Sequence, residues 1–207
     1  MILRTQSRLI AAIALTCAAF APATSQAGDF MVRVRALQLD PANDGYGVGA
    51  SVQVNTKTIW EIDASYFVTP NVALELIATT PQKHTVYVGD QVPANKLGTL
   101  RHLPPTLTVQ YHFAPSNPTV RPYVGAGINY THFSAVNLGG LDTDRHSWGT
   151  AVQVGADFPI TQNLSFNVDF KKIDIRTRVY SDSTHATALG TVKIDPVLFG
   201  IGIGYRF

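Results

Sequence analysis

Apolar and polar positions alternate along the C-terminal segment of the chain, from residue 197 to residue 207. Large apolar or aromatic side chains occupy every second position, and the positions between them hold Leu198, three glycines and Arg206. A period of two places one set of side chains on each face of a β-strand. A chain that closes on such a strand with Tyr205 and Phe207 is typical of a barrel whose last strand contacts lipid.

The same alternation recurs in seven segments upstream, so that eight strands are expected in all. A single-chain bacterial barrel requires an even number of antiparallel strands. In these segments the apolar positions fit a period of two better than the helical period of 3.6. The sequence therefore predicts an all-β fold, an eight-stranded antiparallel transmembrane β-barrel. The expected strands are 30–36, 60–66, 72–79, 107–113, 124–131, 148–158, 164–171 and 197–207.

The connections between these segments alternate in length. Short turns on one rim and long loops on the other are typical of outer-membrane barrels, whose turns are periplasmic and whose loops are extracellular. Short turns rich in Pro, Asn and Ser are expected at 68–71, 114–120 and 159–163. Long polar loops are expected near 37–57, 80–103, 136–147 and 180–192.

One face of the expected strands is apolar and the other carries the acidic and basic residues. A Lys or Arg on the lipid side at mid-depth costs about 2–4 kcal/mol, so the apolar face is expected to contact lipid. A soluble eight-stranded barrel would have the opposite polarity. His132 and Lys172 are exceptions on the outward face, and we expect them near the outer rim, within reach of lipid headgroups.

The N-terminal segment has the composition of a secretory signal peptide. Arg4 and Arg8 precede an apolar run, and Ser-Gln-Ala at 25–27 fits a small-x-small cleavage site. We therefore expect residues 1–27 to be removed on export and residues 28–207 to form the barrel. A membrane anchor is the alternative, but the apolar run is shorter than the roughly 20 residues that a spanning helix needs.

Cysteine content and charge narrow the chemistry of the exported chain. The single cysteine, Cys17, lies in the expected signal peptide, which leaves neither disulfides nor thiolate ligands. Removal of Arg4 and Arg8 leaves equal numbers of basic and acidic residues, so that nucleic acid is not an expected partner. The histidines at 84, 102, 112, 132, 146 and 185 form no recognisable metal-ligand motif, and neither a metal nor a cofactor is expected.

Catalytic motifs such as Gly-x-Ser-x-Gly and His-Glu-x-x-His do not occur in the sequence. We therefore expect that the protein is not an enzyme. A lipid-modifying enzyme that draws Ser, His and Asp from separate loops remains an alternative, because such a triad needs no local signature.

Several runs resemble the OmpW family of small outer-membrane barrels. They lie at 71–81, 102–106, 121–131, 147–149 and 204–207, and the most specific are His-Leu-Pro-Pro-Thr and Arg-Pro-Tyr-Val-Gly-Ala-Gly-Ile-Asn-Tyr. The resemblance spans essentially the whole chain after the expected signal peptide. It implies an eight-stranded barrel with a narrow, mostly apolar interior that admits small hydrophobic molecules and releases them sideways through the wall.

Six side chains on the inward face are candidates for the lumen of such a pore: Ile77, Glu75, Asp63, Gln110, Asp169 and Lys171. Ile77 matches an apolar lumen position of the family. Lys171 departs from the family pattern, because a bulky apolar residue is expected there, and it would pair with Glu75, Asp63 or Asp169 and fill the lumen. The inward acids and bases form either an ion-selective or catalytic lining or an ion-pair network that fills the small barrel.

Pro104 and Pro105 open the fourth expected strand. Proline removes backbone donors from a sheet and belongs at strand starts or edges. The two prolines are therefore either an ordinary strand boundary or a gap in the wall, and in the second case they are candidates for a lateral exit. The inward glycines either widen a passage or leave room for large facing side chains.

The expected function is that of a narrow pore for passive uptake of small hydrophobic molecules. The protein itself is expected to be exported through the periplasm and inserted in the bacterial outer membrane. The alternative is a closed structural or surface-interaction barrel whose outer loops, around 40–58 and 142–146, bind a ligand or partner. Expected partners are outer-membrane lipids, small hydrophobic solutes and the barrel-assembly machinery. Tyr205 and Phe207 are the candidate terminal assembly signal.

Overall fold

The computed structural model describes residues 28–41, 44–46, 52–54, 57–88 and 96–207. The expected signal peptide and Cys17 lie outside the described residues, and the expectations about them stay predictions. Within the described part, no helix is long and apolar enough to cross a membrane.

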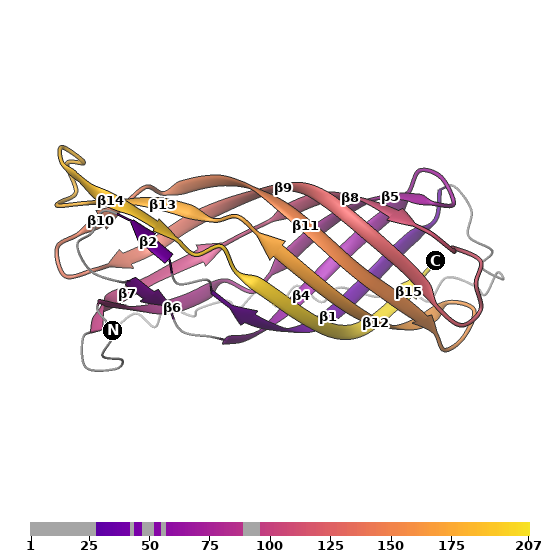
Figure 1. Ribbon diagram of the computed structural model, residues 1–207. Coiled ribbons are helices and arrows are strands. Elements are labelled where there is room, and N and C mark those ends of the chain that lie inside the picture. The colour runs from indigo at the N-terminus through magenta and orange to yellow at the C-terminus, as the bar shows by residue number, and fades with distance from the viewer. Residues whose placement is uncertain (1–27, 42–43, 47–51, 55–56, 89–95) are drawn as a thin grey trace, which may run out of the picture.

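Eight long strands close into one antiparallel barrel (Figure 1). Their order around the wall is β11-β12-β15-β1-β4-β5-β8-β9, and pairing of β9 with β11 closes the ring. The predicted fold is confirmed. The barrel strands are β1 (Phe30–Asp40), β4 (Lys57–Phe67), β5 (Val72–Thr79), β8 (Thr106–His112), β9 (Arg121–Asn137), β11 (His146–Pro159), β12 (Leu164–Ile173) and β15 (Val197–Arg206).

The segments expected as long loops contain further strands, so that this part of the prediction is wrong, and β13 lies almost wholly between the seventh expected strand and the expected loop 180–192. These strands are β2 (Asp44–Tyr46), β3 (Val52–Val54), β6 (Gln82–Val88), β7 (Lys96–Leu103), β10 (Asp142–Thr143), β13 (Arg176–Tyr180) and β14 (Ala188–Lys193). They lie beyond one end of the barrel (Figure 1). A second sheet has the order β10-β13-β14-β2, and the β6–β7 hairpin pairs with β3 and β9. Pairing between strands satisfies backbone groups that a long loop would leave to water.

The short turns lie at the other end, where the chain also terminates (Figure 1). The turn between β4 and β5 is closed by Thr69, whose hydroxyl accepts hydrogen bonds from the backbone of Asn71 and Val72. In the turn between β8 and β9, the side chain of Asn117 accepts from two backbone N–H groups. The predicted asymmetry of the rims is therefore present, with strands in place of loose loops on the long side.

The two faces of the wall have the predicted polarity. Trp60, Val109 and Trp148 lie on the outer surface with exposed fractions of 64%, 52% and 69%, whereas Arg33 and Arg35 inside the barrel are 0% exposed. Alternation at period two produces this division, because neighbouring residues of a strand point to opposite faces. The two expected exceptions, His132 and Lys172, are exposed on the outward face.

Candidate functional site

With the short turns taken as the lower end of the barrel and the outer strands as the upper end, the lower half of the interior is filled by a network of buried charges. Arg33 Nη2 lies 2.9 Å from Asp157 Oδ2, and Arg33 Nη1 lies 3.2 Å from Asp63 Oδ1 and 3.4 Å from Glu75 Oε1. Arg35 Nη1 lies 2.9 Å from Asp63 Oδ2, and Arg35 Nη2 lies 3.5 Å from Glu75 Oε1. All five side chains are buried. Each carboxylate thus has a cationic partner, which buried charges require.

Lys171 joins this network from β12, which is separated from β1 by β15 alone. Its Nζ lies 2.6 Å from Glu61 Oε1 and 3.1 Å from Asp169 Oδ1. Asp169 also accepts a 2.7 Å hydrogen bond from the Tyr123 hydroxyl. Of the three predicted partners of Lys171, the structure places Asp169 at ion-pair distance, and it adds Glu61, which the sequence analysis did not name as a partner. Lys171 therefore fills the lumen as a network member.

Polar side chains complete the network around Glu75. The Thr108 hydroxyl and the Gln153 amide donate hydrogen bonds of 2.9 and 2.6 Å to Glu75 Oε2. A Cβ added at Gly125 would lie 2.7 Å from the Gln153 side chain, so that this glycine makes room for a facing side chain. Gly155 does the same for Tyr123, whose hydroxyl would lie 2.4 Å from an added Cβ. At these positions the glycines do not widen a passage.

Gln110 lies at the lower margin of this network. Its Oε1 is 3.1 Å from Nε2 of His112, and both side chains are buried. Gln110 Nε2 has no hydrogen-bond partner within the described residues. The structure therefore brings five of the six predicted lumen residues into one polar layer, and it places the sixth, Ile77, above that layer.

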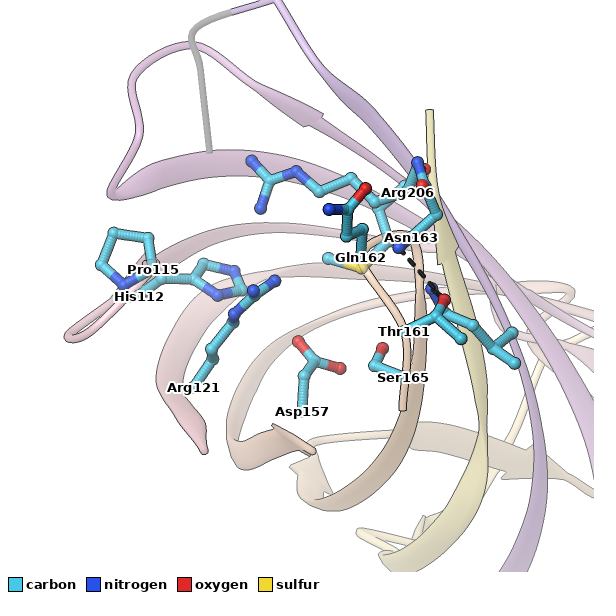
Figure 2. A pocket seen from close by; sticks show the side chains of 11 residues that line it. His112, Pro115, Arg121, Asp157, Thr161, Gln162, Asn163, Ser165 and Arg206 are labelled. Carbon is cyan, nitrogen blue, oxygen red and sulfur yellow. Dashed lines mark hydrogen bonds between the residues drawn. The ribbon is translucent and has the colours of Figure 1, made fainter. Parts of the chain in front are cut away.

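The periplasmic end below the network is nearly closed. A cavity of about 10 Å³ remains there, beside His112, Arg121, Asp157 and Arg206 (Figure 2). Arg206 Nε lies 3.0 Å from Asp29 Oδ2, and its guanidinium carbon lies 3.7 Å from the centre of the Phe67 ring. This volume is at the threshold for a single water molecule, so that the described residues leave no wider space at this end of the barrel.

An apolar cavity lies above the network, towards the outer end. It has a volume of about 10 Å³ and is lined by Leu39, Ile59, Glu61, Ile77, Thr79, His102, Pro104, Thr106, Ile173, Ile175, Pro196 and Leu198. Ile77 is 2% exposed and faces this space, as its predicted lumen position requires. Above the cavity, buried apolar side chains such as Phe133 and Val179 continue towards the outer sheet. The interior is thus ionic below Ile77 and apolar above it.

The wall beside this cavity contains a break in strand pairing. The β5–β8 ladder ends at the pair Ile77–Thr106, and the β6–β7 ladder begins at the pair Gln82–His102. Pro81 on one side and Pro104 and Pro105 on the other lie between these pairs, and none of them has a backbone N–H. The two predicted exit residues thus lie at a true gap between strands.

On its other side, the Pro104–Pro105 segment is firmly attached. The Asn129 amide donates to the carbonyl oxygens of Pro104 and Pro105 at 3.2 and 3.3 Å, and the backbone N–H of Tyr130 donates to Pro105 at 3.0 Å. Asn129 of β9 thus holds the Pro104–Pro105 segment against β9. Asn129 is not among the residues predicted for the site, although its inward position after Ile128 was a usable signal.

A groove on the lipid-facing surface adjoins the same region of the wall. It has a volume of about 310 Å³ and is lined by Val34, Trp60, Glu61, Ile62, Ala78, Thr79 and Thr80. Glu61 and Thr79 line both this groove and the interior apolar cavity. Thr79 Oγ1 has no hydrogen-bond partner within the described residues. Glu61 and Thr79 are a ladder pair of β4 and β5, so that at this point one thickness of the sheet separates the interior space from the lipid side.

The C-terminal residues seal the end of the barrel with the short turns. The backbone N–H of Phe207 donates a 2.8 Å hydrogen bond to Phe30, and the rings of Tyr205 and Phe207 lie 4.9 Å apart. Phe207 is 49% exposed on the outer surface. An apolar outer surface, a polar sealed interior and an aromatic terminal strand define a transmembrane barrel of the bacterial outer membrane.

Comparisons with known proteins place this barrel in a family. The model of the OmpW family matches residues 26–207. Outer membrane protein W of Escherichia coli is 33% identical over 210 residues, which cover 96% of this chain and 98% of that protein. The uncharacterized outer-membrane protein y4mB of Sinorhizobium fredii is 40% identical over 95% of this chain and 90% of its own length. The chain belongs to the OmpW family.

A solved structure agrees with this assignment. The crystal structure of the outer membrane protein OprG from Pseudomonas aeruginosa is similar, with a TM-score of 0.75 and 28% sequence identity. The similarity covers 88% of this chain and 97% of that one. The protein is therefore an integral outer-membrane protein that sits in lipid.

Proposed function

We propose that the protein carries small hydrophobic molecules passively from the outer side of the barrel into the outer membrane, with release through the wall. The observation that carries this proposal is the position of Glu61 and Thr79. Both line the apolar interior cavity beside Ile77, and both line the groove on the lipid side. Because this cavity has a volume of only about 10 Å³, a solute enters it only if the lining side chains move apart. From there one thickness of the sheet separates it from the hydrocarbon, and the ladder is interrupted between the pairs Ile77–Thr106 and Gln82–His102.

The ionic layer below Ile77 supports lateral release over passage to the periplasm. An apolar solute that moved past Arg33, Arg35 and Lys171 would have to separate buried ion pairs whose atoms lie as close as 2.6 Å. Breaking a buried pair costs about 3–5 kcal/mol, and an apolar solute offers no replacement hydrogen bonds. The interrupted ladder beside Pro104 offers a route that leaves the ion pairs intact.

One relative supports the proposed class of solute. A protein of Pseudomonas aeruginosa, 29% identical over 162 residues, is named dibenzothiophene metabolism operon protein PahQ. A polycyclic sulfur compound is apolar, as the solute proposed here is. We further propose that no catalytic step takes place and that the terminal strand, through Tyr205 and Phe207, is recognised by the barrel-assembly machinery.

The experiment is an uptake assay with the refolded protein in lipid vesicles that enclose a reporter of a small apolar solute. Ile77→Phe adds bulk beside a cavity of about 10 Å³ and should slow uptake severalfold. Ile201→Phe is the matched control, because Ile201 is 46% exposed on the outer surface and the same change there leaves the interior unaltered. Equal uptake by wild type, Ile77→Phe and empty vesicles would contradict the proposal.

A second candidate function is that of a closed barrel whose outer sheet binds a ligand or partner. The ordered sheet β10-β13-β14-β2 favours it, because this sheet lies beyond the barrel and takes no part in lining the interior cavity. Binding to cells or to outer-surface molecules that is lost on removal of the β13–β14 hairpin, together with uptake equal to that of empty vesicles, would favour this function over the pore.

A further inference from the structure

Two histidines on the outward face meet across neighbouring strands near the outer rim. His132 on β9 and His146 on β11 are directly paired in the ladder. Their Nδ1 atoms lie 3.4 Å apart, and their ring centres lie 5.0 Å apart. The Tyr130 hydroxyl oxygen lies 2.5 Å from Nδ1 of His146. Both histidines are exposed, so that this convergence is open to water and ions.

We propose that His132 and His146 form a binding site for a divalent late transition-metal ion, with Zn²⁺ as the representative case. Zinc binds imidazole nitrogen at about 2.0–2.1 Å in tetrahedral geometry, which places two ligand nitrogens about 3.3–3.4 Å apart. The observed separation of 3.4 Å between the two Nδ1 atoms matches this spacing without movement of either strand. In the metal-free structure the Tyr130 hydroxyl contacts His146 Nδ1, so that it must turn aside for this nitrogen to bind the ion, and water would complete the coordination.

The site has two protein ligands on rigid backbone. No group of three or more His, Cys, Asp or Glu side chains in the described part of the chain is arranged to hold a metal. The ion is therefore held by two imidazoles and exchanges readily with the solution. The fixed register of β9 and β11 offsets part of the affinity lost by having only two protein ligands, because it pre-organises the two imidazoles. The expectation that no metal binds rested on spacing along the chain, whereas His132 and His146 are separated in the chain and are brought together by the sheet.

The location gives the ion a structural role. Trp148 and Tyr130, the ladder pair two residues further from the outer end, have ring centres 4.8 Å apart, and Trp148 is 69% exposed. Such exposed aromatic residues mark the level of the lipid headgroups in outer-membrane barrels. The ion thus lies at the outer headgroup level and ties β9 to β11 where both leave the hydrocarbon layer.

The test is a titration of the refolded full chain with Zn²⁺, in detergent micelles free of chelators, followed by calorimetry. We expect saturable binding of one ion per chain, and at least a roughly tenfold loss of affinity in His132→Ala and in His146→Ala. His185→Ala is the matched control, because His185 lies in the outer segment between β13 and β14 and contacts Asp142. Its affinity for Zn²⁺ should equal that of wild type.

Three results would overturn the inference. They are the absence of saturable Zn²⁺ binding by the wild-type protein, an equal loss of affinity in His185→Ala, and equal binding of Mg²⁺, which prefers oxygen ligands. If either alanine variant fails to fold, X-ray absorption of the zinc-loaded wild-type protein replaces it. Two imidazole nitrogens in the first coordination shell support the site, and a shell of oxygen alone contradicts it.

Discussion

Arg33 is the cation on which the lower half of the interior depends most. Its guanidinium makes a two-point contact with Asp157, through Nε at 3.1 Å and Nη2 at 2.9 Å, and also reaches Asp63 and Glu75. In an Arg33→Met variant, Asp63 and Glu75 keep Arg35, at 2.9 and 3.5 Å. Within the described residues, Asp157 then retains a 2.8 Å hydrogen bond from the Asn167 amide and has no cation at ion-pair distance.

The expected loss of unfolding free energy in Arg33→Met comes from Asp157, the one carboxylate of the network left without a cation. Removal of one partner of a buried ion pair costs about 3–5 kcal/mol of unfolding free energy. The double variant Arg33→Met/Asp157→Asn removes both charges and should recover most of that loss. Arg178→Met is the control, because Arg178 is exposed and lies 4.0 Å from Asp144, and a surface pair of this kind contributes at most about 1 kcal/mol.

The assay is urea unfolding of the refolded protein in lipid vesicles, followed by tryptophan fluorescence and by the mobility of the folded barrel on gels. An Arg33→Met variant that loses no more stability than Arg178→Met would refute the reasoning. So would a double variant that is less stable than Arg33→Met, because the cost would then not come from an unpaired Asp157.

Three further predictions concern the wall, the terminus and the outer sheet. Asn129→Ala removes the amide that donates to Pro104 and Pro105, and should lower the unfolding free energy by about 1–3 kcal/mol and widen the wall gap, which uptake assays would detect as faster solute entry. Deletion of Phe207 should reduce the amount of folded barrel in the outer membrane of cells more than it reduces refolding in vitro; equal effects would argue against an assembly signal. Burial opposes the charge of Asp142, but the backbone N–H of Thr143, the ring of His185 and the charge of Arg145 lower its pKa. The contribution of this carboxylate to the stability of the outer sheet is therefore present above its ordinary pKa and is lost as pH falls through the lowered value, which amide exchange on Thr143 measures; protection unchanged down to pH values below the carboxyl range would contradict this.

The barrel could be predicted from the sequence because each of its strands lies between two different environments. Lipid on one side and charged neighbours on the other leave a two-residue period, as in the alternation of Val109 with Gln110. The outer strands contact water on more of their surface, so that no such contrast marks them. The segment from 80 to 103 therefore reads as a loop, although it contains β6 and β7.

The candidate site was predictable in part. Parity alone identifies Ile77, Asp63, Glu75, Asp169 and Lys171 as inward residues. It does not identify which charges meet, because contacts across the lumen join strands far apart in the sequence. The 2.6 Å contact of Lys171 with Glu61 spans 110 positions, and only the closed ring brings these residues together.

The gap between strands beside Pro104 and Pro105 was likewise predictable only in part. The two prolines at 104 and 105 predict a local loss of backbone hydrogen-bond donors. The partner of the gap, Pro81, lies on another strand pair, and its position opposite them depends on the register that ends at the pair Ile77–Thr106. Sequence analysis therefore located one edge of the gap and missed the other.

Lateral release above the ionic layer is tested most directly by locating an apolar solute inside the barrel. A small hydrocarbon that carries a nitroxide would be added to methyl-labelled protein in lipid nanodiscs, and the broadening of methyl signals would be recorded. We predict strong broadening at Ile59 and Ile77, which line the apolar cavity, and little at Met31, which lies beside the closed periplasmic end. Equal broadening at Met31 and Ile77 would show that the solute passes the ionic layer, and would contradict the account.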